Sequence, residues 1–338
     1  MTDALRQITD TAASSSPEAA RRRPTSRLGL VGYAIVLIEI VLFAVLSPSF
    51  LNFDNISTML VQSAVYAIAA FGLTIVVVVG GEDVVRGGID LSIGAVLGFA
   101  GALVAVLLKV DLGLPLALII GLAAAALIGL VNGLVVIVGI RPLLVTLAMM
   151  SIVTSLTIVL TNNVKVPVTD AGLTWLREGT ILGLPPSVGI LVVVFAVAAI
   201  AMGRTNWGTR NYAVGQNPLA ARIAGIASSR YTVVSYVLAG LLAGTAGVLM
   251  TSRLSAALPG IGEQSLIDIL LATFLSIAFS RRLVVTITGT LFSAIFVVIL
   301  TNGFSQLGVQ SQWIGVAKGV LILLVLAVAA IRERSVKR

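Results

Sequence analysis

Three ionisable residues lie inside long apolar runs of the sequence. Glu39, Asp268 and Lys318 each interrupt a stretch of otherwise apolar residues. A charged side chain at the centre of a bilayer costs roughly 2.5 to 3.5 kcal/mol, so such residues usually pair with each other or face a polar cavity. Asp268 and Lys318 lie at similar depths from the same end of two runs. We hypothesise that they form an ion pair, although each could instead reach the membrane interface, and Glu39 has no evident partner.

Several other kinds of chemistry are disfavoured by the composition. The chain has no cysteine and no histidine, which removes thiolate nucleophiles, imidazole bases, disulfides and the usual zinc and haem ligands. It has no glycine-rich phosphate loop of the ATP-binding type. No row of carboxylates indicates a proton relay, and no arginine ladder indicates a voltage sensor. We therefore expect a protein that is not an enzyme and holds no metal or cofactor; an intramembrane enzyme is the least favoured class.

The elements that position these residues are predicted to be membrane-spanning helices. Of the 338 residues, 58% are hydrophobic and 11% are charged, against roughly 25% charged in an ordinary soluble domain. Spanning helices need about 17 to 25 apolar residues. The candidates lie near residues 29–46, 56–79, 89–108, 115–138, 143–160, 188–202, 232–251, 266–279, 283–301 and 314–331. We expect an all-α polytopic integral membrane protein with about ten transmembrane helices.

The basic residues predict the orientation of these helices. Most of the 22 Lys and Arg residues fall on the side that holds both ends of the chain, and positively charged loops remain cytoplasmic. Both termini are therefore expected in the cytoplasm. The chain divides into a polar N-terminal tail over residues 1–28, a transmembrane domain over 29–331 and a basic tail over 332–338. This orientation accounts for the net charge of +8 without any partner nucleic acid.

Short internal matches are compatible with an inverted repeat of five plus five helices. The sequence VNGL at 131–134 lies in the fourth predicted span, and TNGF at 301–304 ends the ninth. An internal duplication with inverted topology would give this spacing, although matches this short also arise by chance. Glycine pairs at four-residue spacing, which favour close helix packing in lipid, occur at 94 and 98, 240 and 244, and 315 and 319.

The longest basic internal loop contains a short predicted helix. Asn217 can cap this helix, a proline follows at the first helical position, and Gly225 can end it. Its apolar face is formed by Leu219, Ile223 and Ile226. About eight residues do not hold a helix in isolation. The helix therefore needs a surface, which is either a groove on a soluble partner or the protein's own spans and lipid.

Four segments of the chain resemble the membrane subunits of ABC-type importers for ribose and related monosaccharides. They are GGIDLSIGAV at 87–96, GLVNGLVV with IRPLLVTLAMMSI within 129–152, NYAVGQNPLAARIAGI at 211–226 and YVLAGLLAGTAGVLMTSRL at 236–254. The resemblance extends over nearly all of residues 30–331. It implies a multi-pass permease subunit of the bacterial inner membrane that forms the pathway for a monosaccharide or similar small polar solute.

The resemblance also implies partners. These are two cytoplasmic ATPase subunits that bind ATP and Mg²⁺, an external solute-binding protein, and a second permease subunit in a homodimer or a heterodimer. Membrane lipid surrounds the transmembrane helices. A secondary transporter or channel that acts without ATP is the alternative. The short helix in the basic loop and the lack of proton-relay carboxylates favour the importer.

The resemblance further suggests site residues. The loop around the short helix is similar to the coupling helices that dock on the ATPase subunits, with expected contacts at Asn217, Ala221, Arg222 and Gly225. For the translocation pathway and its gate the matching polar residues are Asp90, Ser92, Asn132 and Asn302. The alternative for the two asparagines is that they tie helices together.

Two segments depart from the family pattern. GEDVVR at 81–86 is an insertion before GGIDLS, and residues 271–291 replace a turn that is usually rich in glycine and serine. In the second segment Ser280 is followed by two arginines. The replacement at 271–291 puts the local gate or ATPase contact in doubt, and either departure would suit a specialised substrate or a subunit that works beside a different partner.

Overall fold

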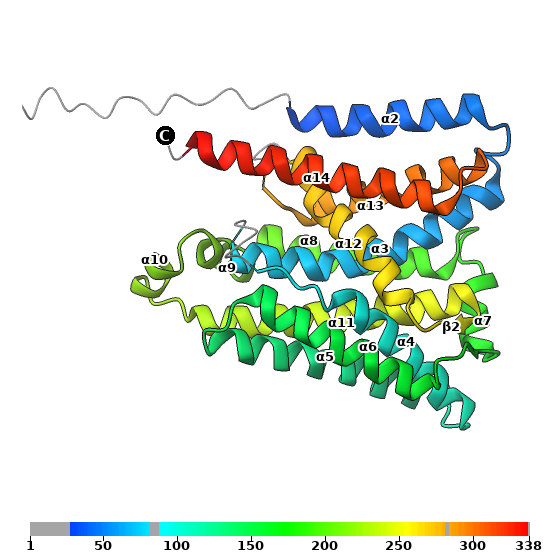
Figure 1. The fold of residues 1–338 in the computed structure, drawn as a ribbon, viewed down its shortest axis with the longest axis horizontal. Coiled ribbons are helices and arrows are strands. Elements are labelled where there is room, and N and C mark those ends of the chain that lie inside the picture. The colour runs from blue at the N-terminus through cyan, green and yellow to red at the C-terminus, as the bar shows by residue number, and fades with distance from the viewer. Residues whose placement is uncertain (1–27, 82–87, 281–283, 337–338) are drawn as a thin grey trace, which may run out of the picture.

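Long α-helices, most of them running along the same axis in alternating directions, form the molecule (Figure 1). The computed structural model describes residues 28–81, 88–280 and 284–336. The helices are α2 (Leu28–Leu46), α3 (Phe53–Gly80), α4 (Ile93–Lys109), α5 (Leu114–Ile137), α6 (Pro142–Thr161), α7 (Ala171–Glu178), α8 (Pro186–Arg204), α9 (Asn206–Gln216), α10 (Pro218–Ile223), α11 (Ser228–Leu254), α12 (Ile261–Leu275), the 3-10 helix η1 (Ser276–Phe279), α13 (Ile287–Gln306) and α14 (Ser311–Val336). Two short strands, β1 (Val166–Pro167) and β2 (Ala256–Ala257), pair antiparallel with Val166 opposite Ala257.

The predicted class, an all-α polytopic membrane protein, is confirmed. In the described part of the chain, seven helices are long and apolar enough to cross a membrane. They are Phe53–Gly80, Leu114–Ile137, Pro142–Thr161, Pro186–Arg204, Ser228–Leu254, Ile261–Phe279 and Ile287–Gln306. Three shorter apolar helices, Gly32–Leu46, Ile93–Lys109 and Ser311–Val325, coincide with the remaining predicted spans. The count of ten spans and the inverted repeat stay predictions.

Helix α3 is the centre of the bundle. Its residues from Ser63 to Val79 are all buried, and it packs against α8, α11, α12 and α13. A helix that is apolar on every side is stable only where neighbours cover it. The outer helices α5, α6 and α8 instead keep large exposed apolar side chains, as expected for surfaces that face lipid.

Glycines let α11 lie unusually close to its neighbours. A Cβ atom at Gly240 would collide with the backbone oxygen of Ala125 in α5, and one at Gly247 would collide with that of Leu97 in α4. Backbones this close gain van der Waals contact, the main source of helix association in lipid. These crossings fix α11 against both α4 and α5.

The three predicted glycine pairs have different outcomes. The pair at 94 and 98 lies where α4 crosses α12, and the pair at 240 and 244 lies where α11 crosses α5. At residues 315 and 319 an added Cβ would meet no atom within 4 Å. The first two pairs are therefore tight crossings within this chain, and the third is not.

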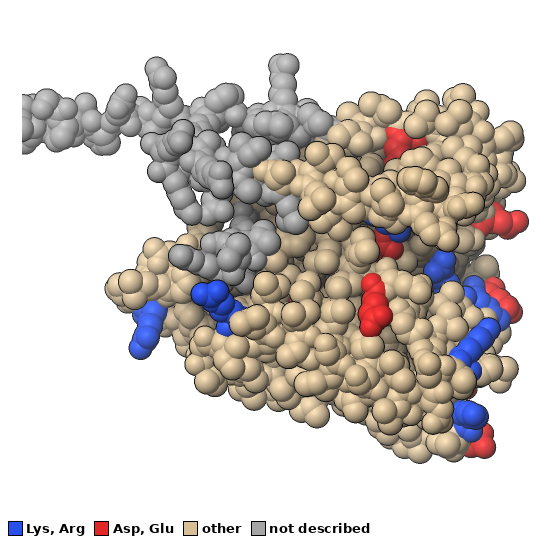
Figure 2. Space-filling model, in the orientation of Figure 1, with Lys and Arg blue, Asp and Glu red and all other residues tan. Residues whose placement is uncertain are grey.

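The two ends of the bundle carry the charge. The start of α2 and the end of α14 lie at the same end as α9 and α10 (Figure 1). Figure 2 shows basic side chains beside α10, side chains of both signs at the opposite end, and an uncharged surface over α5 and α6 between them. This is the distribution expected when the ends face water and the middle faces lipid.

Several predicted segments fall outside the described residues. These are the N-terminal tail apart from Leu28, residues 82–86 of the insertion, and the two arginines after Ser280. At the other end α14 continues to Val336. The predicted basic tail from residue 332 therefore begins within α14, and its boundary stays a prediction.

Candidate functional site

Three of the predicted pathway residues form one buried hydrogen-bond network. Asp90 Oδ1 accepts hydrogen bonds from the backbone N–H (2.8 Å) and hydroxyl (2.6 Å) of Ser92. The amide of Asn132 in α5 donates to Ser92 Oγ at 2.9 Å. Asp90, Ser92 and Asn132 are 3%, 0% and 0% exposed. In this conformation the network ties the turn before α4 to α5. This is the alternative role of Asn132, in which it holds helices together instead of lining the pathway.

Thr146 of α6 holds the same turn from the other side. Its hydroxyl accepts from the backbone N–H of Leu91 (3.1 Å) and donates to the carbonyl of Ile89 (3.2 Å). Thr146 is fully buried. The sequence analysis missed this residue, since a single threonine in an apolar run gives no signal of its partner. The turn is thus fixed by hydrogen bonds to two helices before α4 begins.

Asn302 lies in a different polar contact. It forms a reciprocal amide pair with Asn55 of α3, with Nδ2–Oδ1 distances of 3.0 and 2.8 Å. Gln306 donates a further hydrogen bond to Asn55 at 3.1 Å. Asn132 and Asn302 are close to the final turns of α5 and α13, which end at opposite ends of the bundle (Figure 1). The structure therefore does not bring the two asparagines together.

The structure brings together the two residues of the hypothesised ion pair. Lys318 Nζ of α14 lies 2.6 Å from Asp268 Oδ1 of α12, and the two side chains are 11% and 6% exposed. Figure 2 shows charged side chains of both signs in the hollow between the α14 layer and the layer below it. Glu39 of α2 is 6% exposed, and among the described residues neither of its carboxylate oxygens has a hydrogen-bond partner.

The short helix predicted in the basic loop is α10. The side chain of Asn217 caps it by accepting a hydrogen bond from the backbone N–H of Ala220 at 2.9 Å. Gly225 ends it with a φ of +80°, a conformation that favours glycine. The side chains of Leu219 and Ile223, one helical turn apart, are 69% and 81% exposed. The helix thus presents two apolar side chains to the outside.

One of the four predicted partner contacts on this loop faces the protein. Ala221 is 5% exposed and packs in a cluster with Val79 of α3 and Val214 of α9. It therefore anchors α10 on the bundle. Leu219 and Ile223 were not among the predicted contacts, although their spacing already placed them on one face.

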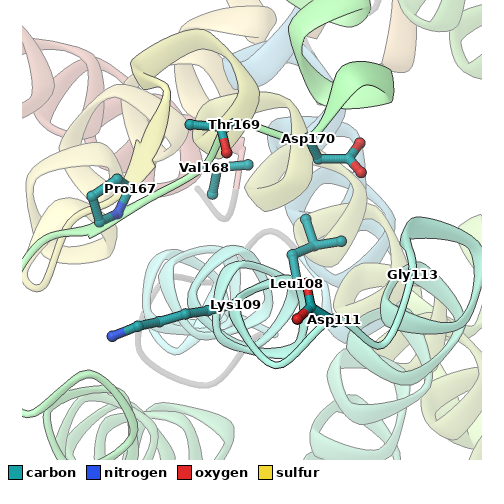
Figure 3. Close-up of a pocket in the computed structure, with 8 residues that line it drawn as sticks. All are labelled: Leu108, Lys109, Asp111, Gly113, Pro167, Val168, Thr169 and Asp170. Carbon is teal, nitrogen blue, oxygen red and sulfur yellow. The ribbon is translucent and has the colours of Figure 1, made fainter.

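The pocket drawn in Figure 3 lies near α7 and the α4–α5 turn, at the end of the bundle opposite α10 in Figure 1. Its volume is about 430 Å³. It lies between the turn that joins α4 to α5 and the segment between β1 and α7, and it is lined by Leu108, Lys109, Asp111, Gly113, Pro167, Val168, Thr169 and Asp170. Asp170 already caps α7 by accepting from two backbone N–H groups, and the Lys109 side chain points away from the pocket (Figure 3). None of the predicted site residues lines it.

Comparison with known proteins identifies a transport family. Residues 55–326 match the family described as "Branched-chain amino acid transport system / permease component". The chain is 37% identical to the ribose import permease protein of Bacillus subtilis, over 89% of this chain and 91% of the relative. It is 34% identical to the ribose import permease protein of Escherichia coli K12, over 87% and 91%. It is 30% identical to the L-arabinose ABC transporter permease protein of Azospirillum brasilense, over 92% of both. No solved structure matches the chain.

Proposed function

The chain belongs to the permease-component family that it matches over residues 55–326, and from this premise we propose that it is the permease subunit of a bacterial ABC importer for a monosaccharide or similar small polar solute. It is a multi-pass protein of the inner membrane. The observation that carries the sugar assignment is the similarity to ribose and arabinose permeases over nearly the whole chain. The family description names branched-chain amino acids, which makes these the competing substrate class.

We infer ten membrane spans for this subunit. The seven long apolar helices and the three shorter ones follow one another in alternating directions, so that an even number returns the chain to its starting side. Both termini would then be cytoplasmic, together with α9 and α10. An inverted repeat of five plus five helices is compatible with Asn132 and Asn302 lying at opposite ends of the bundle.

ATP hydrolysis is assigned to two partner subunits in the cytoplasm, which would dock on α10. Its exposed residues Leu219 and Ile223 suit a groove on such a partner. Ala221 connects the same helix to Val79, in the last turn of α3. A push on α10 would therefore reach the central helix directly. ATP binding would shift the bundle between inward-open and outward-open states through its different affinity for the two.

The complete importer would also contain an external solute-binding protein and a second permease subunit, identical to this chain or different from it. The alternative function, an ATP-independent secondary transporter or channel, leaves the exposed apolar pair on α10 without a role. No chain of carboxylates through the described helices supports proton coupling.

The test is transport by the assembled complex. The chain is reconstituted in liposomes with its ATPase subunits, and uptake of radiolabelled D-ribose and L-leucine is measured with the corresponding binding protein outside. We expect ATP-dependent uptake of the monosaccharide and none of the amino acid. Uptake that continues without ATP would establish the alternative, and uptake of leucine alone would make the substrate class wrong.

A further inference from the structure

A second polar cluster lies in the half of the bundle opposite α10. It consists of Gln62 and Tyr66 of α3, Arg253 of α11 and Asp268 of α12, and is called here the outer cluster. Arg253 Nη2 donates a hydrogen bond to Gln62 Oε1 at 3.2 Å. The phenol of Tyr66 interacts with both Gln62 and Asp268. Three central helices therefore converge on one set of polar side chains, of which only Asp268 belongs to a pair predicted from the sequence.

The outer cluster runs from the surface inward. Gln62 and Arg253 are partly exposed, whereas Tyr66 is 8% and Asp268 4% exposed. Helix α3 enters the bundle from this end, so Tyr66 lies one turn deeper than Gln62, a step of about 6 Å along the axis. A solute that enters from the outer side would meet Arg253 and Gln62 first and Tyr66 and Asp268 next.

The hydrogen-bonding capacity of the cluster exceeds what the structure uses. A guanidinium carries five N–H donors, and Arg253 uses one on Gln62 and makes a long contact of 3.8 Å to the sulfur of Met250. No carboxylate among the described residues forms an ion pair with it. Arg253 lies in the last turn of α11 and is partly exposed, so its remaining N–H donors are available to a solute that enters from the outer side.

The residue types match the chemistry of a sugar. Guanidinium, amide and carboxylate groups can each hold neighbouring hydroxyls in a plane, and an aromatic ring offers an apolar face to the C–H side of a pyranose or furanose. A few convergent polar groups against an apolar wall are also what fixes the orientation of a small ligand.

We propose that the outer cluster is a binding subsite for a polyhydroxylated solute on the outer half of the translocation pathway. Arg253 and Gln62 form its accessible rim, and Tyr66 and Asp268 form its inner wall. Lys318 holds the Asp268 carboxylate in place through the 2.6 Å ion pair and is a positioning residue. This inference rests on the proposed function, because it names residues that contact the imported solute.

Cysteine labelling tests the position of the subsite directly, since the natural chain contains no cysteine. Single variants Q62C, Y66C and S63C are assembled with the partner subunits in liposomes and treated from outside with a membrane-impermeant maleimide. Ser63 lies between the two test positions and is 3% exposed on another face of α3, so S63C is the matched control. We expect labelling of Q62C in every state, labelling of Y66C only when nucleotide opens the outer side, and none of S63C.

The effect of the solute distinguishes a subsite from an accessible surface. D-ribose delivered by its binding protein should slow labelling of Q62C and Y66C by roughly tenfold when about nine-tenths of the subsites are occupied, because the bound solute shields both positions. Labelling rates that are equal with loaded and empty binding protein would overturn the proposal. So would a Y66C variant that stays unlabelled with every nucleotide.

Hydroxyl deletion gives a second, independent measurement. Uptake of D-ribose and its single-deoxy analogues is compared between the wild type and the variants Q62L and Y66F. If Gln62 or Tyr66 contacts a hydroxyl, its mutation should reduce uptake of the analogue that lacks this hydroxyl roughly tenfold less than it reduces uptake of D-ribose. Equal losses for every analogue would show a structural role and overturn the subsite. A wild type that imports no monosaccharide would instead contradict the proposed function.

Discussion

At the residue scale, a charged side chain buried between apolar helices lowers the stability of the protein unless a charge of the opposite sign pairs with it. Lys318→Met would leave the Asp268 carboxylate buried without its 2.6 Å partner. Breaking a buried pair from one side costs roughly 3 to 5 kcal/mol, so we expect the free energy of unfolding in detergent micelles to fall by about that amount. The exposed pair of Arg177 and Glu178, at 28% and 64% exposure, provides the control, and Glu178→Ala should change stability by less than about 1 kcal/mol.

Exchanging the two charges separates electrostatics from packing. The double variant D268K/K318D keeps one charge of each sign at the α12–α14 contact. We expect it to recover most of the stability that D268K and K318D lose singly, because the ion pair is restored in the reverse direction. A double variant no more stable than either single variant would show that the attraction between the charges is not what holds α14 to α12.

The network around Ser92 allows a test of whether its hydrogen bonds act together. Ser92→Ala removes the hydroxyl that joins Asp90 to Asn132, and Asn132→Leu removes the donor from the other side. Each change should lower the free energy of unfolding by about 1 to 3 kcal/mol. Since the two residues share one hydrogen bond, the double variant should cost less than the sum of the singles. Additive losses, measured by denaturant unfolding, would contradict a shared network.

At the element scale, the glycines of α11 determine how closely the central helices pack. A Cβ at Gly247 would collide with the Leu97 carbonyl of α4, so Gly247→Ala should push the helices apart and cost about 1 to 3 kcal/mol, as overpacking does. Gly189 of α8 has no atom within 4 Å of an added Cβ. Gly189→Ala should therefore be neutral or stabilise by up to about 1 kcal/mol through helix propensity. Thermal unfolding of both variants provides the comparison, and a Gly247→Ala protein as stable as the wild type would exclude the close crossing.

The exposed face of α10 can be tested without disturbing its anchor. Leu219→Asp and Ile223→Asp place charges on side chains that are 69% and 81% exposed, so the permease itself should fold normally. We expect binding of the ATPase subunits to weaken by at least about tenfold, since apolar anchors at an interface contribute roughly 1 to 2 kcal/mol each. Ser229→Asp, at an exposed position in the first turn of α11, is the control in the pull-down. Unchanged binding by both aspartate variants would mean that the partner docks elsewhere.

The helices could be predicted from the sequence, and most of their partners could not. Each long apolar run forms a helix, because a segment long enough to span the membrane must pair its backbone N–H and C=O groups internally. Helix α9 was missed because its sequence is polar and contains two glycines. The contact between Asn55 and Asn302 joins residues 247 positions apart, and no local pattern encodes it. The Asp268–Lys318 pair is different, because equal depth along two apolar runs is visible in the sequence.

The inward position of Ala221 has the same origin. The side chains of a six-residue helix point in all directions around its axis. Which of its faces packs against the protein depends on Val79 and Val214, which belong to other helices. The predicted contact set therefore mixed outward residues with an inward one. Leu219 and Ile223 do carry a signal in the sequence, because a helix this short cannot bury its own apolar side chains.

At the scale of the whole molecule, helix α4 decides the number of spans. It has 17 residues, about 25 Å of helix, which is less than the roughly 30 Å of a hydrocarbon core. The turn that precedes it makes up part of the difference, because Asp90 and Ser92 are buried between α5 and α6 and are satisfied by hydrogen bonds there. Irregular backbone at membrane depth is tolerated only where protein covers it in this way. We therefore expect α4 to cross together with its turn, which would place the loop to α5 outside the cell.

The side on which the α4–α5 loop lies is tested by side-specific labelling at the two loops that flank α5. Val110 after α4 and Ile140 after α5 are 66% and 48% exposed, so V110C and I140C should react readily. In right-side-out vesicles an impermeant maleimide should label V110C at once and I140C only after the membrane is permeabilised. Because each further span reverses the side, this pair of results fixes the parity of every helix that follows. If V110C were protected and I140C labelled from outside, the predicted orientation of the bundle would be wrong, and α10 would face away from any cytoplasmic ATPase.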